Sequence, residues 1–148
     1  MLSTAIRRTI ASMLKHHWLP QNPLVRQIIA LAYTAVLTVV LLQSSSHPYV
    51  GPAAPPGAPD PGRELLLTSG HIIGFTILVF LWWWVLSPWP RALLIAVLIA
   101  LLLGTITEIL QSLVPDRSSS LFDLATNYVV TLAVAWIIHT YHLRTLHK

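Results

Sequence analysis

The chain has 148 residues, of which 55% are hydrophobic and only 9% are charged, whereas charged residues make up about 25% of an ordinary soluble domain. A water-soluble fold would leave too much of this apolar surface exposed, so the composition predicts an integral membrane protein with one compact bundle. The formal net charge is +4 and there are no cysteines, which excludes disulfides, thiolate metal sites and cysteine nucleophiles.

The first 20 residues predict a short amphipathic helix that lies on the membrane surface. Its hydrophobic positions recur at helical spacing and are Leu2, Ile6, Ile10, Met13 and Leu14. The basic residues Arg7, Arg8 and Lys15 lie largely off that stripe, where they meet anionic lipid headgroups rather than nucleic acid. The alternative is a disordered basic tail.

Residues 21–148 form the predicted membrane domain. It contains four apolar stretches, each close to the roughly 20 residues that a helix needs to cross a hydrocarbon core. The predicted spans cover residues 27–43, 65–86, 92–114 and 121–138. The expected fold class is therefore all-α, an integral membrane four-helix bundle preceded by an amphipathic interfacial helix.

Three breaks separate these spans. Residues 44–62 are rich in proline, which forbids a helix and predicts an extended, solvated loop. Residues 87–90 form a tight second break with two prolines. Residues 114–120 form the third, in which Ser119 or Ser120 could cap the fourth helix.

The distribution of lysine and arginine predicts the orientation of the chain. If the N-terminus is cytoplasmic, all of these residues except Arg63 and Arg117 lie on the cytoplasmic side. We therefore expect a multi-pass protein of a bacterial-type cytoplasmic membrane, with both termini in the cytoplasm. The proline-rich loop and the turn around Arg117 would then face outward.

Polar residues interrupt three of the spans near their predicted outer ends. The third span carries one stripe of Gly104, Thr105, Glu108, Gln111 and Ser112. The fourth carries Asp123, Asn127 and Thr131, each four residues apart, and the second carries Thr68, His71 and Phe75. Because these helix ends lie on the same side, we expect the three faces to meet.

Glu108 lies about 9 Å below the end of the third span at 1.5 Å per residue. A carboxylate at that depth must be protonated or paired, and Arg117 is the expected partner because it can make two parallel hydrogen bonds to a carboxylate. Asp123 competes for it. One interpretation is a closed network that locks the helical hairpin, and the other is an outward-facing pocket. The candidate residues are His71, Glu108, Gln111, Arg117, Asp123 and Asn127.

These residues carry a family resemblance. The pattern Glu108-x-x-Gln111, Pro115-x-Arg117 and Asp123-x-x-x-Asn127, preceded by His71, resembles the VanZ-like family. Its members are small membrane proteins named after a factor in low-level resistance to the antibiotic teicoplanin. The resemblance covers about residues 65–131 and implies a role in the cell envelope, without implying a defined mechanism.

Three functions are compatible with this pattern. In the first, which we favour, the polar cluster binds a lipid or cell-envelope headgroup. In the second, the chain is a non-catalytic accessory subunit of a larger membrane complex, respiratory or photosynthetic, with other membrane subunits as partners. In the third, it is a membrane enzyme acting on a lipid-linked substrate, with His71 and Glu108 or Asp123 as acid and base.

No metal site and no cofactor are predicted. Ligation of haem or chlorophyll by His71 or His139 is the alternative, and it would rest on a lone histidine in a helix. The tryptophans around the second break are typical of an aromatic belt at the membrane interface. They are Trp82, Trp83, Trp84 and Trp89.

Overall fold

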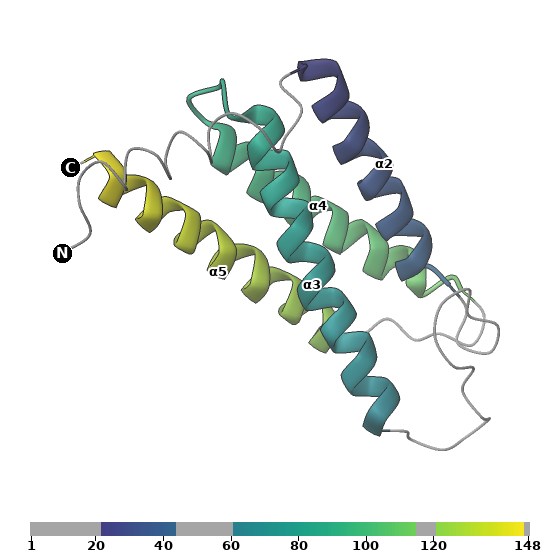
Figure 1. Cartoon of the computed structure of the whole chain (residues 1–148). Coiled ribbons are helices and arrows are strands. Elements are labelled where there is room, and N and C mark those ends of the chain that lie inside the picture. Colours follow the sequence, from purple (N-terminus) through teal and green to yellow (C-terminus); the bar gives the residue numbers. More distant parts are fainter. Residues whose placement is uncertain (1–21, 44–60, 115–120, 147–148) are drawn as a thin grey trace.

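The computed structural model describes residues 22–43, 61–114 and 121–146, which form four α-helices (Figure 1). These are α2 (Pro23–Leu41), α3 (Pro61–Leu86), α4 (Ala92–Gln111) and α5 (Leu121–Leu146). No strand occurs in these three stretches, and the predicted all-α, four-helix membrane architecture is confirmed. The predicted interfacial helix of residues 1–20 and the turn around Arg117 lie outside the described residues.

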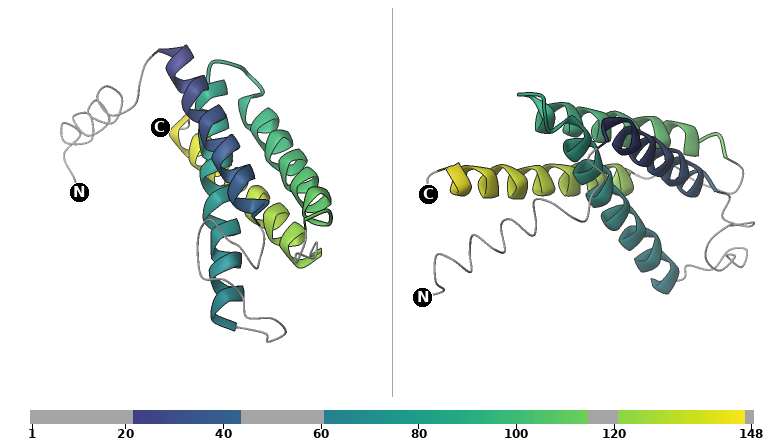
Figure 2. Two further views of the ribbon diagram at one scale, coloured as in Figure 1. Left: turned by 90° about the vertical axis from the view of Figure 1, so that its right-hand side faces the viewer. Right: turned by 45° about the horizontal axis from the view of Figure 1, so that its top comes forward.

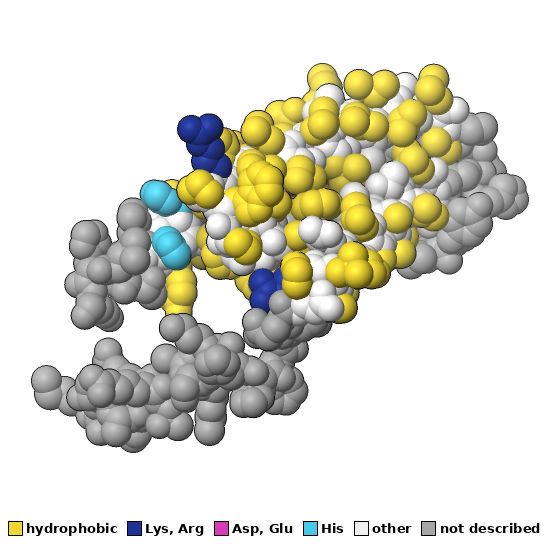
Figure 3. Space-filling model, turned by 90° about the horizontal axis from the view of Figure 1, so that it is seen from above, with side chains coloured by type: hydrophobic (Ala, Val, Ile, Leu, Met, Phe, Trp, Pro, Cys, Tyr) yellow, Lys and Arg dark blue, Asp and Glu magenta, His cyan; other side chains and the backbone are white. Residues whose placement is uncertain are grey.

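Each helix contains a segment long and apolar enough to cross a membrane. These segments are Pro23–Leu41, Leu65–Leu86, Ala92–Gln111 and Leu121–His142. Large hydrophobic side chains are exposed along all four helices, and they cover much of the face seen in Figure 3. Such a surface is stable in hydrocarbon and not in water, so the chain is a multi-pass membrane protein.

The helix boundaries differ from the prediction for local reasons. Helix α2 begins at Pro23, before the predicted residue 27, because the Asn22 side chain accepts a 2.9 Å hydrogen bond from the Leu24 N–H and proline suits a first turn. Helix α3 likewise begins at Pro61, within the predicted loop of residues 44–62. Helix α4 ends at Gln111, after which Leu113 and Val114 each bond back three residues and tighten the chain into a turn.

Helix α3 lies at the centre of the bundle. It packs against α2, α4 and α5, and α4 also packs against α5, whereas α2 touches α4 only slightly. The two views in Figure 2 show that the helices cross at appreciable angles. Phe75, Leu78 and Val79 of α3 are fully buried in the core, where they meet Leu37 and other residues from the neighbouring helices.

Small residues bring the helices close together. On α4 a buried stripe with four-residue spacing runs through Ala92, Ala96, Ala100 and Gly104, a pattern that favours close approach of membrane helices. A Cβ atom on Gly104 would lie 3.3 Å from the Phe75 ring and 3.5 Å from Asn127 Cβ. One turn after Gly104 the same face of α4 becomes polar at Glu108. The polar residues therefore lie next to the point where α3, α4 and α5 are in close contact.

Candidate functional site

A cluster of polar side chains is buried between α3, α4 and α5, at the end of the bundle where α4 ends and α5 begins. Its members are each at most 5% exposed, and we call them the buried polar cluster: His71, Thr107, Glu108, Gln111, Asn127 and Thr131. Polar groups inside a membrane bundle face inward because hydrocarbon cannot satisfy their hydrogen bonds. The expectation that three polar faces meet is therefore met for these residues.

One hydrogen bond joins α3 to α5 within the cluster. His71 Nδ1 and Asn127 Oδ1 are 2.9 Å apart. Because an amide oxygen only accepts, Nδ1 donates, and Nε2 of a neutral His71 ring is then an acceptor. Phe75 lies one turn further along α3 with its ring parallel to the imidazole, the two centroids being 6.4 Å apart.

A second hydrogen bond joins α4 to α2. Gln111 Nε2 donates to the Leu41 carbonyl oxygen at 2.8 Å, one of the carbonyls that the end of a helix leaves without an intrahelical partner. Gln43, just beyond the end of α2, is also buried. The first membrane helix thus contributes to the site through its backbone, which the sequence pattern did not indicate.

Several buried polar atoms have no hydrogen-bond partner among the described residues. They are His71 Nε2, Gln111 Oε1, Asn127 Nδ2 and Thr131 Oγ1. Leaving a buried donor or acceptor unsatisfied costs about 1–3 kcal/mol. The set contains acceptors, a donor and a hydroxyl that can do both, so the cluster can hydrogen-bond a polar group that offers donors and acceptors together.

Two other residues predicted for the site, Asp123 and Arg117, are not members of the buried polar cluster as defined above. Asp123, one turn closer to the start of α5 than Asn127, is half-buried. Arg117 falls outside the described residues, so its pairing with Glu108 or Asp123 stays a prediction.

The predicted polar stripe on α4 was too wide. Ser112 is exposed and donates to the Ile109 carbonyl oxygen, and Thr105 is half-buried, with its hydroxyl 2.7 Å from that of Tyr128. Ser112 is one residue, or about 100° of helix rotation, beyond Gln111, and Thr105 is two residues, or about 200°, before Thr107. Thr107 was missed, although it lies four residues before Gln111; its hydroxyl donates to the carbonyls of Leu103 and Gly104 on its own helix.

The side chains of the cluster can donate and accept hydrogen bonds. Within the described stretches, no three His, Asp or Glu side chains gather closely enough to hold a metal ion. No family model, curated protein or solved structure matches the chain. His139, the other histidine considered for a cofactor, is exposed on α5 near the opposite end of the bundle.

Proposed function

We propose that this chain is a VanZ-like membrane protein whose buried polar cluster binds the polar headgroup of a lipid or cell-envelope precursor from the outer side of the membrane. The burial of His71, Glu108, Gln111 and Asn127 supports the proposal, because these four are among the positions that carry the family resemblance and they come from three helices. These polar side chains are costly inside a membrane bundle, and apolar residues could pack the same helices together.

The unfilled hydrogen-bonding capacity is the observation that carries this proposal. A headgroup hydroxyl would donate to His71 Nε2, and a hydroxyl, amide or phosphate oxygen would accept from Asn127 Nδ2 or Thr131 Oγ1; none of these three atoms has a partner among the described residues. In a low-dielectric interior each such bond is worth more than it is in water. Ligand entry would separate the ends of α2 and α4, where the Gln111–Leu41 hydrogen bond closes the cluster.

A second candidate function is that of a non-catalytic accessory subunit in a larger membrane complex. An apolar groove of about 680 Å³ between α3 and α5 favours it. Phe80, Trp83 and Ile137 are among the residues that line this groove, and a helix of another subunit could cover them. In that case the polar cluster would only fix the packing of the helices.

Substitution of Thr131 by valine tests the headgroup proposal. Thr131→Val removes a buried hydroxyl that lacks a partner, so the ligand-free protein should be equally stable or more stable. Thr105→Val is the matched control, because the Thr105 hydroxyl pairs with Tyr128 and lies off the cluster. We expect the parent and the control to retain a stoichiometric polar lipid after purification in mild detergent, and Thr131→Val to lose it.

Mass spectrometry of the purified proteins separates the outcomes. Equal lipid retention by all three proteins, or no retained lipid in the parent, contradicts the headgroup proposal. A stoichiometric set of other subunits that co-purifies with every variant supports the accessory function instead.

A further inference from the structure

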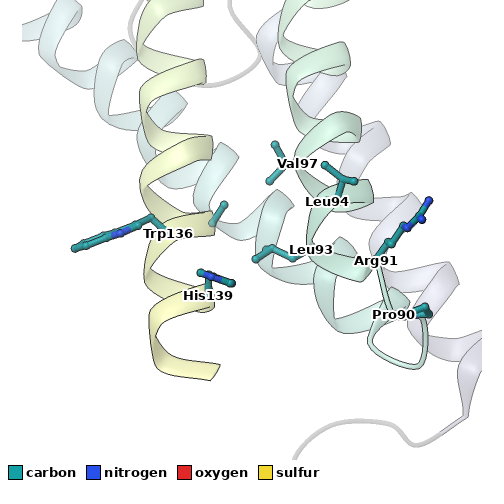
Figure 4. Close-up of a pocket in the computed structure, with 8 residues that line it drawn as sticks. Pro90, Arg91, Leu93, Leu94, Val97, Trp136 and His139 are labelled. Atoms are coloured by element: carbon teal, nitrogen blue, oxygen red, sulfur yellow. The ribbon is translucent and has the colours of Figure 1, made fainter. Parts of the chain in front are cut away.

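A second groove lies at the end of the bundle that is opposite to the buried polar cluster. It is formed between the start of α4 and the C-terminal half of α5 (Figure 4). Its volume is about 450 Å³, and Arg91, Leu93, Leu94, Trp136 and His139 are among the residues that line it. The apolar span of α4 begins at Ala92 and that of α5 ends at His142. The groove therefore lies at the level where a membrane helix passes from the acyl chains to the headgroups.

The polar lining of this groove is basic. Arg91 and His139 are both exposed, and none of the described lining residues is acidic. In Figure 4 His139 points from α5 toward α4, whereas Arg91 extends along the outside of α4. An exposed arginine changes rotamer within nanoseconds, so its guanidinium can turn toward an anion between the two helices.

The start of α4 supplies backbone hydrogen-bond donors beside this groove. Arg91 precedes the helix but makes no side-chain capping bond. The Ala92 N–H bonds to the Trp89 carbonyl oxygen and the Ile95 N–H to that of Arg91, whereas the N–H groups of Leu93 and Leu94 have no backbone acceptor among the described residues. Free N–H groups at a helix start favour an anion, and here they accompany two basic side chains.

We propose that this groove binds the phosphate of an anionic phospholipid. Arg91 would pair with the phosphate, His139 would donate a hydrogen bond from α5, and the apolar side chains of Leu94 and Val97 would contact the upper part of an acyl chain. The positive-inside orientation places this end at the cytoplasmic leaflet, where anionic lipids concentrate. The groove is remote from the buried polar cluster, so this proposal does not depend on the function proposed for that cluster.

The combination of charge and apolar surface favours a lipid over other occupants. Free phosphate would use Arg91 and His139 but would leave the apolar wall formed by Leu94, Val97 and Ala135 uncovered. A helix of another subunit would cover that wall but would bury Arg91 without a counter-charge, which is costly. An anionic phospholipid would do both, because its phosphate would pair with the basic side chains and its acyl chain would cover the apolar wall.

Lipid binding to the full chain in neutral detergent provides the test. Phosphatidylglycerol and phosphatidylcholine are titrated separately, and bound lipid is counted by native mass spectrometry, with inorganic phosphate as a competitor. We expect phosphatidylglycerol to bind more tightly than phosphatidylcholine. We expect Arg91→Gln to weaken phosphatidylglycerol binding about fivefold, the equivalent of about 1 kcal/mol for one arginine at an anionic membrane surface. His139→Gln should weaken it less.

Arg26→Gln is the charge-matched control. Arg26 lies at the same end of the bundle but outside the groove, with its guanidinium 4.9 Å from the centre of the Trp84 ring. The proposal predicts that this variant keeps its preference for phosphatidylglycerol. Equal losses in Arg26→Gln and Arg91→Gln would show a general charge effect and overturn the site. Equal binding of both lipids, or displacement of the lipid by millimolar phosphate, would overturn it too.

Discussion

His71 on α3 and Asn127 on α5 are joined by a 2.9 Å hydrogen bond across 56 positions of the chain. The bond fixes the level at which the two helices meet and the proton position on the imidazole ring. It also directs His71 Nε2 into the interior as an acceptor. One contact thus links the packing of the bundle to the hydrogen-bonding capacity of its polar cluster.

A double-mutant cycle measures this link. His71→Ala and Asn127→Ala should each destabilise the protein, and the two losses should not add, because either change removes the shared bond. We expect a coupling free energy of about 0.6 kcal/mol, and at most about 1.7 kcal/mol, as double-mutant cycles give for hydrogen bonds within membrane proteins. Unfolding in mixed micelles provides the measurement. Thr126→Ala replaces Asn127→Ala in the control cycle, since the Thr126 hydroxyl donates to the Phe122 carbonyl oxygen of its own helix. Additive losses for His71 and Asn127 would contradict the link.

Substitution of Gln111 should loosen the end of α2. Gln111→Leu keeps a side chain of similar size but removes the donor to the Leu41 carbonyl oxygen, at a cost of about 1 kcal/mol. The amides of Leu42 and Gln43, which bond to the Thr38 and Val40 carbonyls, should then exchange their hydrogens faster.

Hydrogen-exchange mass spectrometry of residues near the end of α2 checks this result. Ser112→Ala is the control, because Ser112 is exposed and its hydroxyl donates to the nearby Ile109 carbonyl oxygen and not to α2. Unchanged exchange in Gln111→Leu, or the same acceleration in Ser112→Ala, would show that the Gln111 bond does not hold α2.

Glycine substitutions test the close approach of the helices. Gly104→Ala places a Cβ atom 3.3 Å from the Phe75 ring, tighter than an ordinary contact. Because the Phe75 side chain is fully buried, its ring has little room to move away, and overpacking of this kind costs about 1–3 kcal/mol. Gly70→Ala is the matched change, since no atom lies within 4 Å of its added Cβ, and it should gain up to about 1 kcal/mol from helix propensity. Thermal unfolding in detergent should therefore shift in opposite directions for the two variants. Similar shifts would mean that α3 and α4 are not held as closely as Gly104 requires.

The sequence predicted the parts of this structure that follow from transfer between water and hydrocarbon. The four spans were identifiable because each is a long apolar segment, and His71, Glu108, Gln111 and Asn127 were identifiable because polar side chains in such segments turn inward. The Leu41 carbonyl could not be identified in this way. Every residue has a carbonyl, and only the crossing of α2 and α4 selects this one.

Rotation around α4 explains the remaining errors. Thr105 and Thr107 are both threonines and both lie one turn or less from Glu108. Their side chains nevertheless point to different sides of the helix, so that Thr107 is buried and Thr105 only half-buried. A stripe drawn from spacing alone has a width of more than one residue, and neighbouring helices decide which edge of it is buried. Ser112 was assigned to the stripe as though the helix continued, whereas α4 ends at Gln111.

The orientation of the chain can be tested directly because the sequence contains no cysteine, so a single introduced thiol is labelled without background. Leu113 is 75% exposed near the end of α4 and Trp89 is 63% exposed before its start, which places the two probes on opposite sides of one membrane helix. The positive-inside distribution predicts that a membrane-impermeant maleimide labels Leu113→Cys in intact cells and labels Trp89→Cys only after lysis. The reverse pattern would turn the buried polar cluster toward the cytoplasm. An envelope precursor could then not reach it from outside, and the anionic lipid proposed for the Arg91 groove would have to come from the other leaflet.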